Sequence, residues 1–272
     1  MRIETDGVGL DVTVEGDGAP VLLLHGWPDT HEVWRDQITA LAAAGYRVIA
    51  PDLRGFGASD RPEGVESYNI LFLLADMVGV LDHLGVEKAH VVGHDWGAAL
   101  AWALGAFVPD RVDHLVALSV GHPSAFVAAG FPQREKSWYM LLFQFEGVAE
   151  QWLSMDGWAN LRAWSGHPGA DEAIARLEEP GALTAGLNLY RANVPPSALV
   201  EPAIEFPLVQ APTMALWGAD EFALTEAQMT GSEAFVSGPF RYERIEGAGH
   251  WLTLEVPDEV NRLLLDFLPA PG

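Results

Sequence analysis

Short apolar runs alternate with helical patterns along most of the chain. Four runs are rich in β-branched and aliphatic residues, as is typical of strands buried on both faces. These runs are PVLLLHG, YRVIAPDL, KAHVVGHD and VDHLVALSVG. Helical periodicity falls between them, over residues 31–44, 69–84 and 96–107. The alternation predicts an α/β fold with a mostly parallel sheet flanked by helices.

The two ends of the chain extend this pattern. Near the N-terminus, LDVTVEGDG alternates apolar and polar residues and ends in a turn, which predicts an arm of an antiparallel edge hairpin. Towards the C-terminus, APTMALWGAD and FRYERIEGAG predict two more strands, and VPDEVNRLLLDFL predicts a final amphipathic helix.

The alternation stops over residues 122–206, which are mainly helical in pattern. Four tryptophans lie in this stretch: Trp138, Trp152, Trp158 and Trp164. We expect residues 122–206 to form a helical lid, or cap, inserted into a core made of residues 1–121 and 207–272. The aromatic side chains predict an apolar pocket beneath the lid, although some of them can simply pack the lid onto the core.

Composition narrows the classes of function. The 272 residues carry a formal net charge of −23, which disfavours binding to nucleic acid or to an anionic membrane surface. The chain has no cysteine, so disulfides and thiolate nucleophiles are excluded. No apolar run approaches the roughly 18 residues of a transmembrane helix, and no signal peptide is visible. We therefore expect a cytoplasmic protein; the sequence leaves its oligomeric state open.

The stretch KAHVVGHDWGAAL carries the first candidate for chemistry. An apolar strand is followed by a tight turn between Gly93 and Gly97 and by a helix of small residues, with Asp95 in the middle of the turn. This is the pattern of a nucleophile elbow, in which the central residue is lifted into the site. Alone, Asp95 would more simply be explained as a helix cap.

Three further motifs favour the nucleophile. HGWP follows the first parallel strand, where the Trp27 amide would contribute to an oxyanion hole. Asp220 and His250 follow the last two strands, in WGAD and GHW, with separations of 220 − 95 = 125 and 250 − 220 = 30 residues. Nucleophile, acid and histidine thus occur in the order of α/β-hydrolases.

Together with DLRGFGASDRP, these motifs resemble the α/β-hydrolase superfamily over the whole chain, and GHDWG resembles its aspartate-nucleophile branch of epoxide hydrolases and haloalkane dehalogenases. The resemblance implies an eight-stranded, mostly parallel sheet with a helical cap. It also implies catalysis that requires neither a cofactor nor a metal ion.

An aspartate nucleophile suits a saturated electrophilic carbon. A serine would form a stable ether there, whereas Asp95 would form an ester that water can hydrolyse beside an oxyanion hole. His250 would activate that water, and Asp220 would orient His250. We prefer Asp220 to its neighbour Glu221 because Asp220 occupies the family's position. The amides of Trp27 and Trp96 would form the oxyanion hole.

The leaving group distinguishes the two reactions of the branch. An opening epoxide needs an O–H donor, and epoxide hydrolases of this fold use two lid tyrosines. Tyr139 in WYMLLFQFEGVAE and Tyr190 in LNLYRANVPP lie in stretches similar to theirs. A haloalkane dehalogenase stays an alternative because Trp96 could bind a halide, and so does a non-catalytic ligand-binding protein on the same fold.

We thus predict an epoxide hydrolase that uses Asp95, His250, Asp220, Tyr139 and Tyr190 on a small hydrophobic epoxide and water. The predicted pocket residues are Trp27, Pro28, Trp96, Phe143, Trp138 and Trp251. The remaining histidines are expected to be structural, surface or packing residues; they are His25, His31, His83, His90, His94, His114, His122 and His167.

Overall fold

A computed structural model describes residues 1–200 and 205–271, and it contains one eight-stranded sheet in the order β1-β2-β4-β3-β5-β6-β7-β8. The strands are β1 (Arg2–Thr5), β2 (Val8–Glu15), β3 (Ala19–Leu24), β4 (Tyr46–Pro51), β5 (Ala89–His94), β6 (Val112–Leu118), β7 (Thr213–Gly218) and β8 (Phe240–Ile245). Strand β2 pairs antiparallel with β1 and β4, and all other pairs are parallel. The predicted α/β-hydrolase fold is confirmed.

The helices alternate with the strands as the sequence predicts. Those of the sheet region are α1 (Arg35–Ala43), α2 (Ile70–His83), α3 (Trp96–Phe107), α10 (Glu226–Thr230), α11 (Leu252–Glu255) and α12 (Pro257–Phe267). Short 3₁₀ turns are η1 (His31–Trp34), η2 (Val65–Tyr68), η3 (Pro109–Arg111), η4 (Pro196–Leu199) and η5 (Gly231–Phe235). The predicted helix over residues 31–44 is therefore η1 followed by α1.

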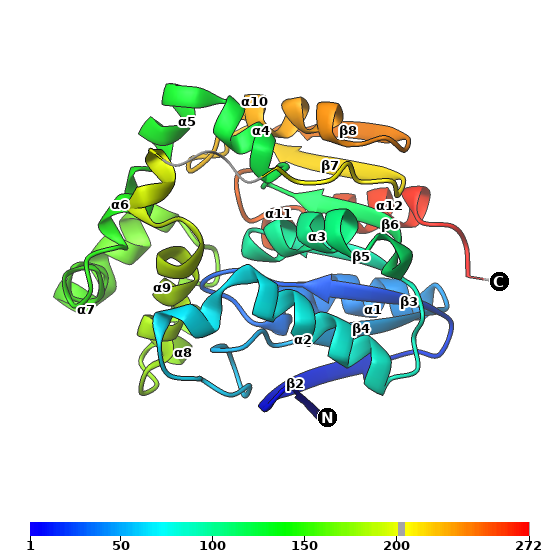
Figure 1. Cartoon of the computed structure of the whole chain (residues 1–272), viewed down its shortest axis with the longest axis horizontal. Coiled ribbons are helices and arrows are strands. Elements are labelled where there is room, and N and C mark those ends of the chain that lie inside the picture. The colour runs from blue at the N-terminus through cyan, green and yellow to red at the C-terminus, as the bar shows by residue number, and fades with distance from the viewer. Residues whose placement is uncertain (201–204, 272) are drawn as a thin grey trace.

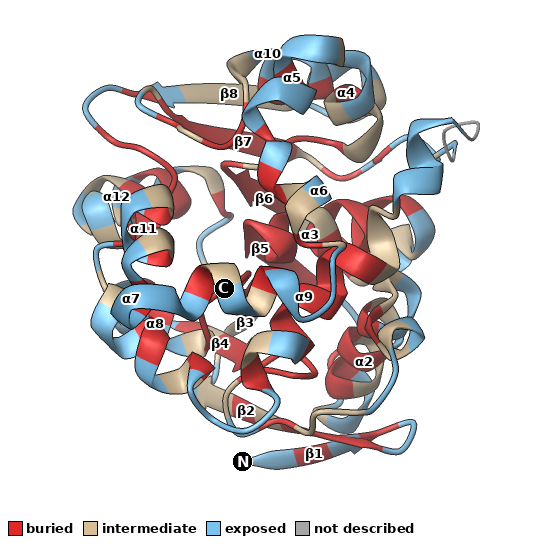
Figure 2. Cartoon of the chain, turned by 90° about the vertical axis from the view of Figure 1, so that its left-hand side faces the viewer, coloured by how far each residue is buried: buried red, intermediate tan, exposed pale blue. Residues whose placement is uncertain are grey.

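The central strands are buried on both faces because helices cover each side of the sheet. In β3, Leu22 and Leu24 join the core beneath α2 and α3, whereas Val21 and Leu23 join the core beneath α1 and α12. Figure 2 shows β3 and β5 as buried strands between helices whose outer faces are exposed. The pattern explains why these strands read as continuous apolar runs.

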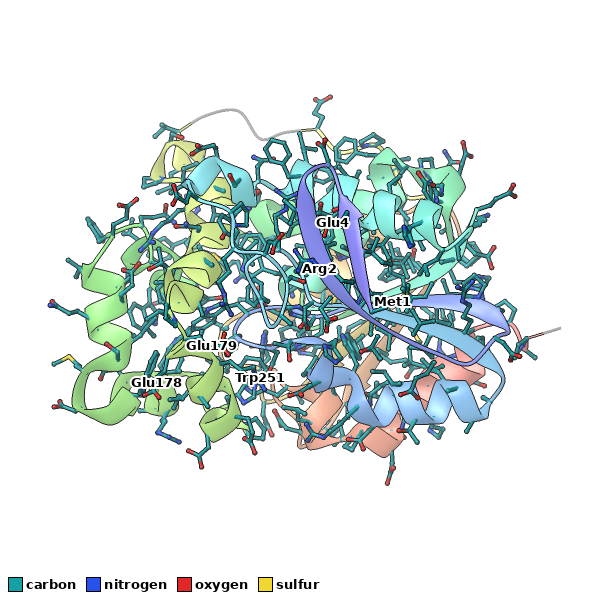
Figure 3. The ribbon with its side chains drawn as sticks, turned by 90° about the horizontal axis from the view of Figure 1, so that it is seen from below. Met1, Arg2, Glu4, Glu178, Glu179 and Trp251 are labelled. Atoms are coloured by element: carbon teal, nitrogen blue, oxygen red, sulfur yellow. The ribbon has the colours of Figure 1, made fainter. Side chains whose placement is uncertain are left out.

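The predicted antiparallel edge hairpin is present, and β2 is one of its arms. Its other arm is β1, which pairs with β2 from Arg2 to Thr5 and is the edge strand, whereas the turn after β2 leads to β3, which pairs with β4 and β5. Figure 3 shows Arg2 and Glu4 on β1, where the Arg2 Nε donates to Glu4 Oε1 at 2.9 Å. Charged side chains of this kind are common on edge strands, where they discourage pairing with another sheet. Such a short polar strand has no apolar run by which the sequence could reveal it.

Six α-helices lie between β6 and β7 in the part of this segment that the structure describes, within the segment expected to be a lid. They are α4 (Pro123–Ala128), α5 (Gly130–Lys136), α6 (Trp138–Leu142), α7 (Val148–Ser165), α8 (Ala170–Leu177) and α9 (Ala182–Asn193). The backbone of α7 leaves helical geometry at residues 155–158. Figure 1 shows α6 to α9 gathered at one end of the sheet. The division into core and lid domains stays a prediction, and residues 201–204 of the expected lid lie outside the described residues.

Buried polar contacts join this helical segment to the sheet region. His167, just after α7, places its Nε2 3.1 Å from both carboxylate oxygens of Asp29. The Trp251 indole donates to the backbone oxygen of Ser165 at 2.9 Å. These side chains are largely hidden from solvent, so the contacts hold the helices directly over the carboxyl ends of the strands.

Candidate active site

Asp95 occupies the tight turn between β5 and α3. Its backbone has φ 53° and ψ −122°, which is a strained conformation for a residue with a side chain. A side chain at Gly93 would collide with the backbone of Gly97, and one at Gly97 would collide with the backbone of Leu24. The close approach of strand and helix therefore requires both glycines, as the elbow pattern predicts.

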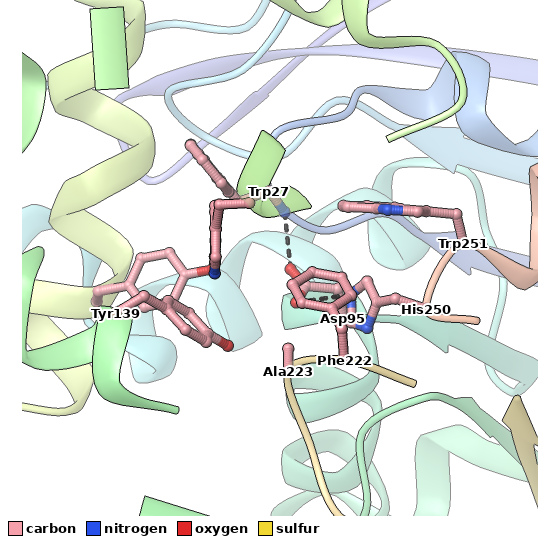
Figure 4. Close-up of a pocket in the computed structure, with 9 residues that line it drawn as sticks. Trp27, Asp95, Tyr139, Phe222, Ala223, His250 and Trp251 are labelled. Carbon is pink, nitrogen blue, oxygen red and sulfur yellow. Dashed lines mark hydrogen bonds and ion pairs between the residues drawn. The ribbon is translucent and has the colours of Figure 1, made fainter. Parts of the chain in front are cut away.

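The two oxygens of the Asp95 carboxylate have different surroundings. Oδ1 accepts a hydrogen bond from the backbone N–H of Trp27 at 2.9 Å, whereas Oδ2 lies 3.5 Å from His250 Nε2. Figure 4 shows Asp95 between Trp27 and His250, with these contacts dashed. Oδ1 therefore lies against the predicted oxyanion-hole amide of Trp27, and Oδ2 faces His250. The contribution of the Trp96 amide to the oxyanion hole stays a prediction.

The structure corrects the predicted acid. Glu221 Oε2 lies 2.7 Å from His250 Nδ1, and the Glu221 side chain is fully buried. Glu221 Oε1 accepts from the backbone N–H of Ala223, which fixes the carboxylate. Asp220 is exposed. The predicted pairing of Asp220 with His250 is therefore wrong, because the turn after β7 points residue 221 inward and residue 220 outward.

The resting charge of His250 follows from its two carboxylate neighbours. Burial by itself lowers the pKa of His250, but the charges and hydrogen bonds of Glu221 and Asp95 outweigh burial and raise this pKa to about 10. Near neutral pH the imidazole is therefore protonated, donating to Glu221 from Nδ1 and facing Asp95 with Nε2.

Two side chains from neighbouring strands hold the His250 backbone. His94 Nε2 and the Ser119 hydroxyl each lie 2.8 Å from the His250 carbonyl oxygen. Burial lowers the pKa of His94 to about 4, so this imidazole is neutral and donates from Nε2. This contact fits the structural role expected for His94, since it positions the loop that carries His250.

Tyr139 on α6 and Tyr190 on α9 line the same pocket as Asp95. Their ring centroids are 6.0 Å apart, and both side chains are buried. Burial raises the pKa of each phenol well above 10, and the negative charge of Asp95 raises it further. Both phenols are therefore neutral O–H donors over the physiological pH range.

Aromatic and small side chains form the rest of the pocket. Its lining residues are Trp27, Asp95, Tyr139, Trp164, Tyr190, Phe222, Ala223, His250 and Trp251. Trp27 and Trp251 were predicted. Trp164 was noted only as one of several lid tryptophans, and Phe222 and Ala223 were missed because they follow the acid in a turn without a motif.

Four other predicted pocket residues do not line this pocket. Trp138 is 48% exposed and packs against Trp152. Pro28 lines a neighbouring cavity, whereas Phe143 and Trp96 pack behind the ring of Tyr190 at centroid distances of 5.0 and 5.1 Å. Neither an aromatic composition nor a motif position reveals which way a side chain points.

Known proteins resemble this chain over nearly its full length. A family model described as the alpha/beta hydrolase fold matches residues 19–257. Epoxide hydrolase A of Mycobacterium tuberculosis is 38% identical, covering 98% of this chain and 96% of its own length. An AB hydrolase superfamily protein of Bacillus subtilis is 36% identical, with the same two coverages.

Solved structures lead to the same family. An epoxide hydrolase of Bacillus megaterium, solved with an inhibitor, has a TM-score of 0.88 and 30% identity, covering 98% of this chain and 99% of its own. Epoxide hydrolase A of Mycobacterium thermoresistibile has a TM-score of 0.80 and 32% identity, with coverages of 100% and 98%. The chain therefore belongs to the α/β-hydrolase superfamily and, within it, to the family of the epoxide hydrolases.

Proposed function

We propose that this protein converts a small hydrophobic epoxide to a vicinal diol through an ester on Asp95. The observation that carries the proposal is the joint placement of Asp95, Tyr139 and Tyr190 on one mainly aromatic pocket. A carboxylate facing two neutral phenols offers both a nucleophile for the carbon and proton donors for the oxygen of the same three-membered ring.

In the first step, Oδ2 of Asp95 forms a bond to an epoxide carbon while the bond from that carbon to oxygen breaks. One phenol, Tyr139 or Tyr190, transfers its proton to the departing oxygen, and the other donates a hydrogen bond to it. The protonated His250 then supplies the proton that restores the phenol. The products of this step are a hydroxyalkyl ester on Asp95 and a neutral imidazole.

In the second step, water attacks the ester carbonyl. His250 accepts the proton from this water at Nε2 while Glu221 stabilises the imidazolium at Nδ1. The negative charge develops on Oδ1, which already accepts the Trp27 N–H at 2.9 Å. On collapse of the tetrahedral intermediate the bond from the Asp95 carboxyl carbon to the ester oxygen breaks, and the departing alkoxide takes the proton of the His250 imidazolium to give the diol. The new carboxylic acid of Asp95 then returns its proton to His250, which restores the resting state, and no cofactor or metal ion is required.

Dehalogenation is the less favoured reaction. A halide would need N–H donors, which the indoles of Trp27 and Trp164 could offer in this pocket, but the reaction would leave the two phenols without a role. Trp96 was the sequence's candidate, but its ring packs on Tyr190 and is not among the residues that line the pocket. The phenols beside Asp95 are instead the O–H donors that the alkoxide of an opening epoxide needs.

The experiment is intact-protein mass spectrometry of His250→Ala after exposure to styrene oxide or to 1-bromobutane. We expect the ester to persist and the protein mass to rise by the full mass of the epoxide, with the adduct mapped to Asp95. His250→Ala combined with Asp95→Asn is the control and should gain no mass. Gain of a butyl group without an epoxide adduct would support dehalogenation, and failure of the wild-type enzyme to turn over any of a panel of epoxides would refute catalysis.

The described residues contain no helix that meets the length and apolarity needed to span a bilayer. The cytoplasmic location stays our proposal.

A further inference from the structure

A second cluster of chemically active side chains lies far from the pocket. His90 is near the start of β5, and Asp113 and His114 are near the start of β6. Asp95 follows the opposite end of β5. At roughly 3.3 Å per residue, the five residues from His90 to Asp95 span about 16 Å along the strand. Nothing in the proposed reaction uses these three residues.

A β-bulge brings the three side chains together. Ala89 pairs with Val112 and Val91 pairs with Leu115, so His90 alone faces the two residues Asp113 and His114. In a regular strand, consecutive side chains would point to opposite faces of the sheet. The additional residue in β6 lets both reach His90, and bulges often redirect side chains at functional sites in this way.

The distances suit a shared cation. Asp113 Oδ2 lies 3.2 Å from His90 Nδ1 and 3.1 Å from His114 Nδ1, and one ligand atom from each residue lies within 4.8 Å of the others. Two ligands about 2.05 Å from a tetrahedral ion are separated by roughly 3.3 Å. A metal ion could thus be accommodated with small side-chain movements.

His90 supplies an independent sign of a ligand site. Its Nδ1 is buried and makes no hydrogen bond with the described residues, although Asp113 Oδ2 is close. The His90 side chain is almost completely buried. A buried polar nitrogen without a hydrogen-bond partner is costly, so this nitrogen favours a ligand between His90 and Asp113.

We propose that His90, Asp113 and His114 form a binding site for a divalent transition-metal ion, with Zn²⁺ as the ion that fits best. Two imidazoles and one carboxylate are a common ligand set for zinc, whereas Ca²⁺ and Mg²⁺ prefer oxygen ligands alone. A fourth position remains for water. The site is separate from the catalytic pocket, and the bound ion would stabilise the folded chain without taking part in the reaction.

The surroundings hold the ligands and leave an entry path. The Tyr46 ring packs against His90, and the Phe267 ring packs against His114, which limits rotation of both imidazoles. Lys88 Nζ lies 3.5 Å from Oδ1 of Asp113, the oxygen that does not face the histidines. The Asp113 side chain is 41% exposed, so an ion can enter from its side.

The ion would join the beginnings of two adjacent strands. Because it binds the folded arrangement, it should raise the unfolding temperature in proportion to the logarithm of its free concentration above the dissociation constant. This predicts stabilisation without any requirement for the ion in turnover.

The test is calorimetric titration of the full chain with ZnCl₂, together with the absorption spectrum of the Co²⁺ complex. We expect one ion per chain, visible Co²⁺ bands of a four-coordinate site, and a higher unfolding temperature with Zn²⁺. His114→Ala and Asp113→Asn alter partly exposed side chains and should each weaken binding at least tenfold. His83→Ala, which removes an exposed histidine elsewhere, should leave the affinity unchanged.

The metal-free unfolding temperatures of the variants show whether each one folds. Loss of the Co²⁺ bands in folded His114→Ala and Asp113→Asn, with His83→Ala retaining them, would support the site. Equal Zn²⁺ affinity in all variants, or no saturable binding by the wild type, would overturn it. Epoxide turnover by the metal-free wild type separates this proposal from the proposed function.

Discussion

Replacing Glu221 by glutamine should slow hydrolysis of the Asp95 ester much more than it slows formation of that ester. The carboxylate of Glu221 is fully buried and lies 2.7 Å from His250 Nδ1. A hydrogen bond to a charged group contributes about 1.5–3 kcal/mol, and 1.36 kcal/mol corresponds to tenfold in rate. Loss of this interaction as the imidazolium forms should therefore slow the second step roughly 10- to 160-fold.

The assay separates the two steps. Enzyme and epoxide are mixed rapidly and quenched with acid, and mass spectrometry measures the fraction of chains that carry the ester over time. In Glu221→Gln the ester should accumulate, because its formation depends on Asp95 and the tyrosines whereas its decay depends on His250. In the wild type, the ester should reach a lower level under the same conditions.

Asp220→Asn is the matched control, since it makes the same chemical change one residue earlier. Asp220 is exposed, and surface substitutions usually change free energies by less than about 0.5 kcal/mol, or roughly twofold in rate. If Asp220→Asn accumulates the ester and Glu221→Gln does not, the assignment of the acid from the structure is refuted.

Three further predictions concern donors, pH and stability. Tyr139→Phe and Tyr190→Phe should each slow ester formation at least about tenfold, and the double variant should slow it about 10²- to 10⁴-fold. Stopped-flow tryptophan fluorescence measures the rate of ester formation, and an unchanged rate in the double variant would exclude phenol catalysis. The pKa of His250 in the folded protein is raised to about 10 from 6.5, so its contribution to the free energy of unfolding is complete below pH 6.5 and is lost as pH rises towards 10. Urea unfolding from pH 6.5 to 9.5 should therefore show a falling free energy of unfolding. A free energy of unfolding that does not change over this pH range would contradict the raised pKa. Asp76→Asn should lower the free energy of unfolding by about 3–5 kcal/mol, because it breaks a buried ion pair with Arg54 Nε at 2.6 Å. A loss below about 1 kcal/mol on urea unfolding would show that this ion pair does not stabilise the fold.

The fold was predictable because its strands and helices carry strong local signals. The buried strands of the centre are continuous apolar runs, and the predicted helix over residues 96–107 begins and ends as α3 does. Strand β1 has no such signal, since it is four residues long and alternates exposed with buried positions. Its pairing with β2 depends on a register that only the folded chain specifies.

The site was predictable where backbone geometry imposes residue identity. The turn at Asp95 requires glycines on both sides, so GHDWG locates the turn, and the motifs HGWP, WGAD and GHW then favour Asp95 as the proposed nucleophile over a helix cap. The acid was not predictable, because residues 220 and 221 both carry carboxylates and no steric requirement visible in the sequence separates them. The direction of the turn after β7 decides between them, and that direction depends on packing against His250 and Ala223.

The charge arrangement of the triad suggests how the proposed steps are ordered. In the resting enzyme, Asp95 and Glu221 together keep His250 protonated, so the imidazole cannot act as a base on water. Formation of the ester removes the charge of Asp95, and with it one of the interactions that raise the His250 pKa. Water activation therefore becomes favourable only after the nucleophile has reacted. Glu221 lies 2.7 Å from His250 Nδ1 and can stabilise the imidazolium in the second step, whereas the exposed Asp220 makes no such contact.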